Sequence, residues 1–309
     1  MMARIFVREG RLRSGWRVGL YLACYLIGLL IVQTPVSVLY VGYAMLRGAR
    51  TASDLLAVLQ LDRLPIWFFL VLKVAELAML LPLTYLFCRF LDRRDWISLG
   101  FRLERGWPAD MLLGLALGGA QMLAILGIGW VGGWLSVGLP DRAALARGLA
   151  EGAVAAALFV LVAVGEELIF RGYLQVNLGE GIGRWEALVF ASLLFGVTHA
   201  LNPHFGWMAL LNIALAGLAM GYGRLVTGNL WLPMAYHLSW NFFQGPVFSL
   251  PVSGMRYAGL LQVANRGGAP LVTGGAFGPE GGLVGTLALL SSFLAFWLWG
   301  RRRGRRRET

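Results

Sequence analysis

Long apolar stretches are the feature that most constrains what this chain can fold into. Predominantly apolar stretches of about 20 residues recur along all 309 residues, and each can cross the ~30 Å hydrocarbon core of a bilayer as a helix. Hydrophobic residues make up 58% of the sequence and charged residues 14%, against about 25% in ordinary soluble domains. The pattern therefore predicts an all-α fold, a polytopic integral membrane helical bundle of about eight transmembrane helices.

The predicted spans follow one another without an internal repeat or a separate soluble segment. They cover residues 16–40, 65–90, 109–135, 152–177, 186–201, 206–224, 229–247 and 281–300. Residues 1–309 are therefore expected to form a single membrane domain. The Gly- and Pro-rich stretch 251–280 is expected to be a long loop before the last span.

The net charge of +11 is explained by membrane topology and does not indicate a nucleic-acid partner. The basic residues gather in short clusters outside the spans, mainly at 4–17, 89–105 and in the tail 301–309. Eight spans place all three clusters on one side, which the positive-inside rule assigns to the cytoplasm. We expect an integral protein of a bacterial cell (plasma) membrane, with cytoplasmic N- and C-termini and a basic cytoplasmic tail at 301–309 that can contact membrane lipid.

Ionisable side chains inside the spans are the candidate functional residues, because a charge at the centre of a membrane helix costs about 2.5–3.5 kcal/mol on insertion scales. They are Lys73, Glu76, Glu166, Glu167, Arg171, His199 and His237, and Asn241 follows His237 by one helical turn. Glu167 and Arg171 share a helix face and can neutralise each other, and Lys73 and Glu76 are expected to form a similar pair. Glu166 is rotated about 100° from Glu167. It has no local partner, so it must meet water, another polar helix or a proton.

Four of these polar residues are predicted to meet at one depth in the membrane: Glu166, His199, His237 and Asn241. They come from three predicted helices, and each lies about 12–20 Å from the expected cytoplasmic end of its helix. A carboxylate and an imidazole can take a proton from water and return one to a leaving amine. His237 and Asn241 can donate hydrogen bonds to an oxyanion. The set predicts amide hydrolysis by activated water, and no serine or cysteine is visibly paired with a base.

A metal site remains an open alternative for the same residues. Glu166, His199 and His237 are the candidate ligands, since two histidines and a glutamate form a known catalytic zinc set. The HExxH signature of common zinc proteases is absent. The sequence alone establishes no cofactor and leaves a divalent metal such as zinc as the one to test.

Three short motifs carry a resemblance to a known family. They are EELIFR at 166–171, FGVTH at 195–199 and HLSWN at 237–241, which match EExxxR, FxxxH and HxxxN in that order. RGYLQ follows the first motif and GNLWLPMAYH leads into the third. Over 150–245 the chain resembles the CPBP family of CAAX-protease and bacteriocin-processing enzymes, also called the Abi family or intramembrane glutamic endopeptidases.

The resemblance implies a role for each motif residue. Glu166 would activate water with the help of His199, and His237 and Asn241 would form the oxyanion site. Glu167 and Arg171 would support Glu166. Residues 150–245 would then be the catalytic core of the membrane domain, and in the family a metal is not a settled requirement.

The leading prediction is an intramembrane endopeptidase that hydrolyses peptide bonds of membrane-associated or lipidated peptides or proteins through glutamate-activated water. Its partner would be a peptide or membrane-protein substrate. One alternative is a non-catalytic membrane immunity or partner protein that retains the motifs. A transporter is a third reading, which inverted repeats with broken helices would favour. The sequence has no such repeat.

Overall fold

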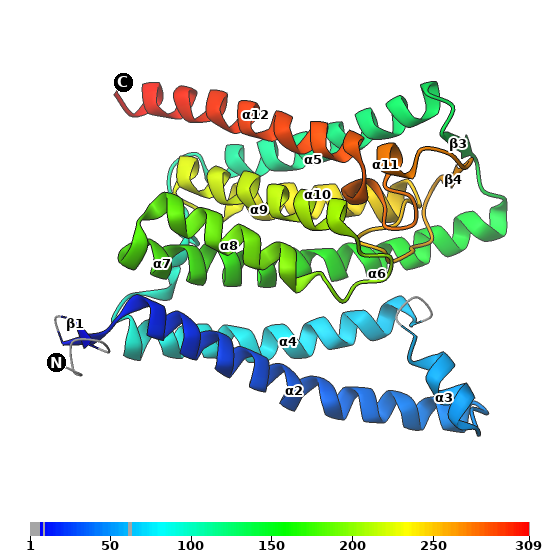
Figure 1. Ribbon diagram of the computed structural model, residues 1–309, viewed down its shortest axis with the longest axis horizontal. Helices are drawn as coiled ribbons and strands as arrows, with labels where there is room; N and C mark the ends of the chain where they lie inside the picture. The colour runs from blue at the N-terminus through cyan, green and yellow to red at the C-terminus, as the bar shows by residue number, and fades with distance from the viewer. Residues whose placement is uncertain (1–6, 9, 61–63, 309) are drawn as a thin grey trace.

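Helices α2 (Ser14–Leu46) and α4 (Ile66–Leu86) form one layer of the structure, and the other long helices form a second, thicker layer against it (Figure 1). In this computed structural model the described residues are 7–8, 10–60 and 64–308. The second layer is built from α5 (Trp107–Val131), α6 (Arg142–Glu167), α7 (Gln175–Ile182), α8 (Arg184–Thr198), α9 (Trp207–Thr227), α10 (Trp231–Phe242) and α12 (Leu283–Glu308). The predicted all-α membrane bundle is confirmed.

Six helices of the described residues are long and apolar enough to cross a membrane. They are Ser14–Leu46, Ile66–Leu91, Trp107–Val131, Arg142–Ile182, Trp207–Thr227 and Leu283–Arg303. The two remaining predicted spans are also helical, but α8 has 15 residues and α10 has 12, fewer than the 17–25 of a typical span. Both belong to the thicker layer, where α8 packs on α9 and α10 packs on α5.

The first and fourth predicted spans are longer than the sequence indicated. Pro35 lies inside α2, which continues to Leu46. The fourth span runs as one helix from Arg142 to Ile182, in which a π-helical segment, η4 (Leu168–Leu174), separates α6 from α7. Two similar π-helical segments, η2 (Phe87–Leu91) and η5 (Phe243–Val247), follow α4 and α10. Such segments are frequent at functional sites, and here they follow the three helices that carry the charged groups described below.

Close contact between α5 and α10 sets the direction in which α10 presents its side chains. Gly114 and Gly118 of α5 form a GxxxG pair, and a Cβ added at either one would lie within 3 Å of the α10 backbone. Small residues at this spacing allow helices in a membrane to pack backbone against backbone. On α10 the side-chain contacts come from Ala235 and Ser239, and the backbone contacts come from Leu232, Tyr236 and Trp240. His237 and Asn241 are therefore turned to other faces of the helix.

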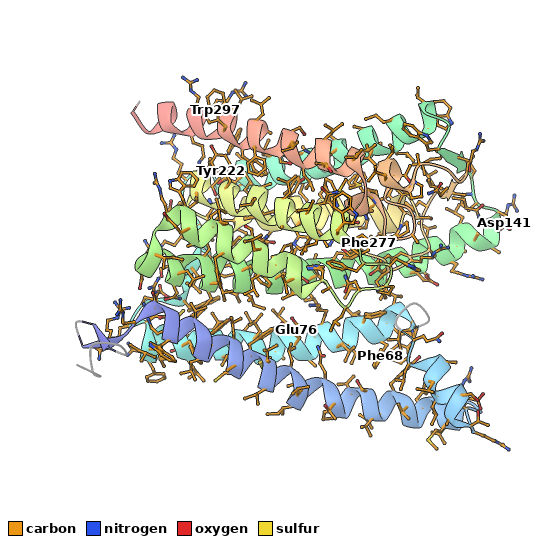
Figure 2. The ribbon with its side chains drawn as sticks, in the orientation of Figure 1. Phe68, Glu76, Asp141, Tyr222, Phe277 and Trp297 are labelled. Atoms are coloured by element: carbon orange, nitrogen blue, oxygen red, sulfur yellow. The ribbon has the colours of Figure 1, made fainter. Side chains whose placement is uncertain are left out.

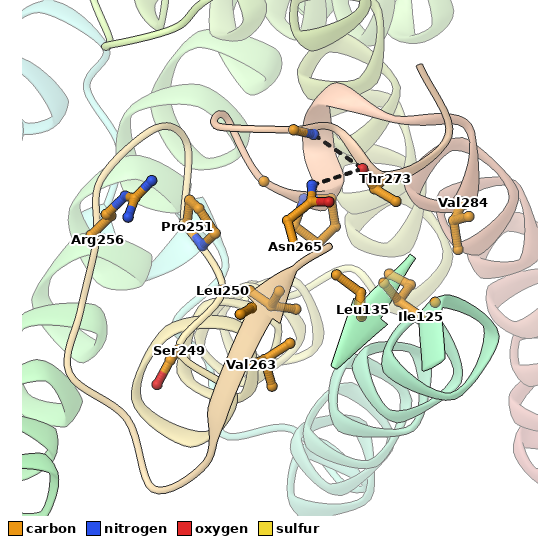
Figure 3. Close-up of a pocket in the computed structure, with 15 residues that line it drawn as sticks. Ile125, Leu135, Ser249, Leu250, Pro251, Arg256, Val263, Asn265, Thr273 and Val284 are labelled. Carbon is orange, nitrogen blue, oxygen red and sulfur yellow. Dashed lines mark hydrogen bonds between the residues drawn. The ribbon is translucent and has the colours of Figure 1, made fainter. Parts of the chain in front are cut away.

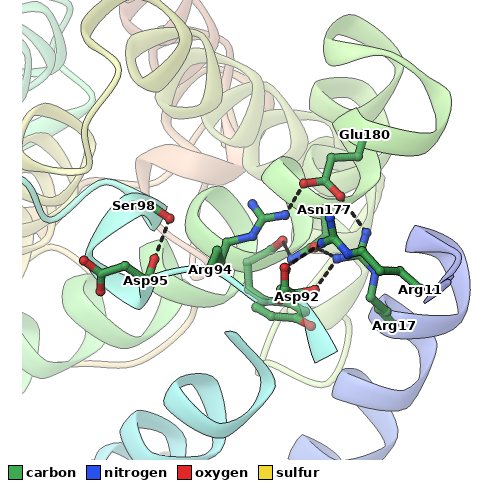
Figure 4. Close-up of polar contacts among 9 residues, drawn as sticks. Arg11, Arg17, Asp92, Arg94, Asp95, Ser98, Asn177 and Glu180 are labelled. Carbon is green, nitrogen blue, oxygen red and sulfur yellow. Dashed lines mark hydrogen bonds and ion pairs between the residues drawn. The ribbon is translucent and has the colours of Figure 1, made fainter. Parts of the chain in front are cut away.

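A polar network joins the two layers at the end of the bundle where α2 begins and α12 ends (Figures 1 and 4). Arg17 of α2 is buried and pairs with Asp92, which follows α4. It also donates to Asn177 at 2.8 Å and to Glu180 at 2.6 Å, both on α7. Arg94 binds the other oxygen of Glu180. The network sits beside a short 3-10 turn, η3 (Trp96–Leu99), and the hairpin of β1 (Val7–Arg8) and β2 (Arg11–Leu12).

The predicted loop 251–280 folds back over the opposite end of the bundle. Its strand β4 (Gln262–Asn265) pairs antiparallel with β3 (Leu135–Gly138), with Leu135 opposite Asn265. Two short helical turns, α11 (Pro270–Thr273) and η6 (Pro279–Gly281), lead into α12, while α3 (Ala52–Val58) connects α2 and α4. Phe277 is 3% exposed and lies inside the bundle (Figure 2).

A cavity of about 310 Å³ lies between this loop and the end of α5 (Figure 3). Its lining combines apolar side chains such as Ile125 and Leu250 with Asn265 and Thr273, which are hydrogen-bonded to each other. Arg256 is the one charged side chain among its described lining residues, and it is exposed. Its described lining residues include no pair of groups suited to proton transfer.

Candidate active site

Glu167 is the hub of a buried ionic cluster at the end of α6. Its Oε1 accepts hydrogen bonds from Arg171 at 3.0 Å and from Nδ1 of His237 at 3.0 Å. The Glu167 side chain is fully buried and Arg171 is 1% exposed. The predicted pair of Glu167 and Arg171 therefore forms, and its carboxylate reaches across to α10. Because Nδ1 of His237 faces a carboxylate, the ring is held with Nε2 directed the other way.

Glu166 faces a different set of partners from its sequence neighbour. Its Oε1 lies 3.9 Å from the ammonium of Lys73 on α4, and its Oε2 lies 3.9 Å from Nε2 of His237. Oε2 is buried and accepts no hydrogen bond from the part of the chain that the structure describes. Glu166, which has no partner on its own helix, therefore lies between Lys73 of α4 and His237 of α10.

Lys73 connects Glu166 to a second carboxylate. Its ammonium lies 2.9 Å from Glu76, which is 4% exposed and also accepts a hydrogen bond from the hydroxyl of Tyr25 at 2.9 Å. Glu76 lies on the face of α4 that is turned toward α6 (Figure 2). The predicted pair of Lys73 and Glu76 forms, and it is part of an array that joins both layers of the bundle at Glu166.

Phe195 contacts both His199 and Arg171. The Arg171 guanidinium lies 4.2 Å from the centre of the Phe195 ring, and the rings of His199 and His237 meet the same ring edge-on at 4.8 and 6.3 Å. Nδ1 of His199 lies 2.8 Å from the Phe195 carbonyl oxygen and donates to it, which leaves Nε2 as the acceptor. Phe195 is 3% exposed, so it fixes these groups from inside the bundle.

One cavity of about 170 Å³ brings four of the predicted site residues together: Glu166, His199, His237 and Asn241. Asn241 is 7% exposed, and its amide has no hydrogen-bond partner in the described part of the chain, so both N–H groups can serve a ligand. The walls are mainly apolar and aromatic, with Phe159, Trp240 and Met255 among them. Apolar walls with a few convergent polar groups are typical of a ligand or active site.

The candidate metal ligands do not form a three-ligand group. Across the described residues, no group of three His, Cys, Asp or Glu side chains is placed to hold a metal ion. Nδ1 of His237 is engaged by Glu167, and the ammonium of Lys73 stands beside Glu166, where it would compete with a divalent cation. These residues therefore do not fit the metal alternative.

Comparisons with known proteins agree with the geometry. The sequence model of a family described as type II CAAX prenyl endopeptidase Rce1-like matches residues 149–243. This stretch, the Rce1-like segment, is similar to that family over about a third of the chain. The resemblance drawn from the three motifs is thereby confirmed, since the Rce1-like segment contains all of them.

The chain is also similar to one curated protein. This relative is the uncharacterized protein YpbD of Bacillus subtilis (strain 168), 35% identical over 81 residues. The alignment covers 26% of this chain and 38% of the relative, so the chain matches well under half of that protein's length. No solved structure matches the chain.

Three residues that contact the site or its neighbours lie outside the Rce1-like segment and outside the motifs. Lys73 was predicted to pair with Glu76 alone. An ionisable residue inside a membrane span is a candidate functional residue, so Lys73 could have been assigned to the site. Tyr25 gives no sequence signal, because a tyrosine is ordinary in a membrane helix. Glu280 also lines the cavity. Its carboxyl group stands directly before the last predicted span, and this position could have marked it as a candidate site residue.

Proposed function

We propose that this protein is an intramembrane endopeptidase that hydrolyses peptide bonds of membrane-associated or lipidated peptides or proteins. The observation that carries the proposal is the convergence of Glu166, His199, His237 and Asn241, from helices distant in sequence, on one cavity inside an apolar bundle. A carboxylate, two imidazoles and a free amide at one place are the groups that hydrolysis by activated water requires.

Glu166 is the general base of the proposed reaction. Its Oε2 is buried without a hydrogen bond and can accept one from water, while Nε2 of His199 accepts the other hydrogen and orients the oxygen. As the water oxygen bonds to the scissile carbonyl carbon, its proton passes to Glu166 and the carbonyl oxygen becomes an oxyanion. Lys73 balances the carboxylate charge from α4 in surroundings with little water to do so.

Asn241 and His237 stabilise the oxyanion in this proposal. The amide of Asn241 is free to donate, and protonated His237, held by Glu167, donates through Nε2. The C–N bond then breaks, and Glu166 returns its proton to the leaving amine. The products are a carboxylic acid and an amine, and Glu166 ends as a carboxylate. The same glutamate serves as base and then as acid, so no second acid is needed.

The proposed setting is the plasma membrane of a bacterium, with both ends of the chain in the cytoplasm. The beginning of α2 and the end of α12 lie at one end of the bundle, which supports placing both on the same side (Figure 1). The basic residues at that end, Arg17 and Arg303 among those described, support the cytoplasmic assignment through the positive-inside rule. Membrane lipid would surround the apolar outer faces of α2 and α12.

The test compares purified wild type with Glu166→Gln in nanodiscs, using a library of lipidated and unlipidated peptides read by mass spectrometry. Glu186→Gln, an exposed change on α8, is the matched control. We expect cleavage by wild type and by the control, unaffected by a chelator, and a loss of about 10²–10⁴-fold in Glu166→Gln. Cleavage lost to the chelator would instead establish a required metal. No cleavage of any peptide by wild type would favour the non-catalytic partner protein.

A further inference from the structure

Glu280 is a buried carboxyl group in the cavity that the proposed reaction does not use. It is 7% exposed and lines the same cavity as Glu166, His199, His237 and Asn241. It belongs to η6, at the end of the loop that folds back over the bundle, and lies outside the Rce1-like segment. A buried carboxylate is unfavourable without a compensating partner, so its presence needs a physical reason.

The Glu280 carboxyl is held in place by neutral donors. Its Oε2 accepts a hydrogen bond from the amide of Gln244 at 2.7 Å and a longer one from the backbone N–H of Ser253 at 3.3 Å. Its Oε1 is 3.4 Å from the hydroxyl of Ser253, beyond the usual hydrogen-bond distance. Oε1 therefore retains capacity to accept a stronger donor. No Lys, Arg or His of the described chain forms an ion pair with Glu280.

Anchoring of the loop does not require this negative charge. The side chain of Gln244 is fully buried, and its Oε1 has no hydrogen-bond partner in the described structure. A glutamine at position 280 could accept the hydrogen bonds from Gln244 and Ser253 through its one amide oxygen. A neutral side chain could therefore anchor the loop, and what the carboxyl group adds is the capacity to bind a cation.

The loop backbone keeps the carboxyl in the cavity. Gly278, two residues earlier, has a φ of 104°, and a Cβ there would lie 2.0 Å from the carbonyl oxygen of Pro251. Only glycine permits this close approach of the two ends of the loop. Together with the hydrogen bonds to Gln244 and Ser253, the packed backbone prevents Glu280 from swinging out to solvent.

We propose that Glu280 recognises a positively charged side chain of the substrate, a lysine or an arginine, close to the bond that is cleaved. The inference rests on the proposed peptidase function and names a substrate class for that site. A cavity of ~150 Å³ accepts a benzene-sized group, so the 170 Å³ here accommodates about one side chain. Val252 and Met255 offer apolar contact for the stem of the side chain, and Glu280 meets its charged end.

Binding is measured separately from cleavage, so that the inference does not depend on turnover. Random peptides with equal amounts of lysine and norleucine at one position are captured on Glu166→Gln protein in nanodiscs and counted by mass spectrometry. We expect lysine to be enriched about ten- to a hundredfold, the effect of one charge-assisted hydrogen bond in a dry site. Glu166→Gln/Glu280→Gln should lose the enrichment, and Glu166→Gln/Glu186→Gln should keep it.

A second measurement covers the case in which the double variant fails to fold. Photo-lysine, which retains its ammonium group, replaces lysine in the enriched peptides, and the crosslinked residue on Glu166→Gln protein is mapped. Crosslinks to Ser253, Tyr257 or their loop neighbours support the inference, and crosslinks confined to another part of the protein overturn it. Equal capture of lysine and norleucine, or no capture of either, also overturns it.

The two proposals fail in different ways. If wild type cleaves lysine and norleucine peptides equally well, the peptidase function stands and the role of Glu280 is wrong. If wild type cleaves neither but captures lysine peptides through Glu280, the recognition site stands and the catalytic proposal is wrong.

Discussion

Nδ1 of His237 and Oε1 of Glu167 lie 3.0 Å apart, so the second glutamate of the EE pair holds a histidine from a helix 70 residues along the chain. The same oxygen accepts from Arg171, which is buried and rests on Phe195. Glu166, the first glutamate, meets Lys73 instead. Two adjacent carboxylates therefore have separate tasks, because α6 turns one toward the ionic cluster and the other toward α4.

Glu167→Gln should destabilise the folded protein. The substitution leaves Arg171 buried without a counterion, and breaking such a pair from one side costs about 3–5 kcal/mol. We expect a clear drop in the midpoint of thermal unfolding, followed by tryptophan fluorescence in detergent, together with a loss of peptide cleavage.

Glu167→Gln/Arg171→Met separates the two effects. Removing both charges should restore much of the unfolding midpoint, because no unpaired ion remains in the apolar interior. Cleavage should stay low, since His237 has lost its carboxylate partner. A single Glu167→Gln variant as stable as wild type would contradict the buried ion pair on which this prediction depends.

Lys73 and Glu76 form an ion pair, yet their substitutions should differ in effect. Lys73→Met removes the cation beside Glu166, and we expect kcat for peptide cleavage to fall about tenfold or more. Glu76→Gln leaves the ammonium free to serve Glu166 alone, so activity should remain near that of wild type. Equal losses in the two variants would indicate that the pair only stabilises α4.

The sequence predicted the separate elements of this site well, because each depends on local information. Hydrophobic length predicted six of the eight spans, while α8 and α10 are shorter than a typical span. The four-residue spacing predicted the pair of Glu167 and Arg171. Ionisable residues are costly inside a membrane, so few occur there and each of them is a candidate functional residue. All three motifs lie within the matched residues 149–243. The structure places His199 just after the end of α8, where the sequence predicted it inside a span, and it places Arg171 in η4.

Contacts between helices could not be predicted in the same way. Periodicity defines the face of one helix but not which neighbour that face meets, so the approach of Lys73 to Glu166 was not visible. The π-helical turn η4 also changes the rotation of the residues that follow Glu167. Composition predicted that 251–280 is a loop but not the path of the loop. Glu280 reaches the cavity because glycines such as Gly278 allow the loop to fold back on itself.

Asn241→Ala should lower kcat and leave KM nearly unchanged. The Asn241 amide makes no hydrogen bond within the described protein and is proposed to bind the oxyanion, which exists only after water attacks. Removing one such donor lowers kcat by about 10²–10³-fold in other hydrolases. Steady-state kinetics on a peptide cleaved by wild type measure the change. A rise in KM at constant kcat would assign Asn241 to substrate binding instead.

The stability of the protein should fall with rising pH through Glu280. Burial raises the pKa of Glu280 from its ordinary 4.5 to about 7, and hydrogen bonds from Gln244 and Ser253 offset part of that rise. The folded state therefore holds a proton that the unfolded chain releases. The resulting stability is complete below pH 4.5 and is lost as pH rises through about 7.

Glu280→Gln isolates this effect from other titrating groups, since glutamine does not ionise. The stability of wild type relative to Glu280→Gln should be greatest near pH 4.5, decrease by on the order of 3 kcal/mol toward pH 7, and change little above it. Thermal unfolding of both proteins in the same detergent over this range measures the difference. A difference that is flat across the range would mean that Glu280 is solvated in the folded protein, which would also remove the reason to expect a bound cation at this carboxyl.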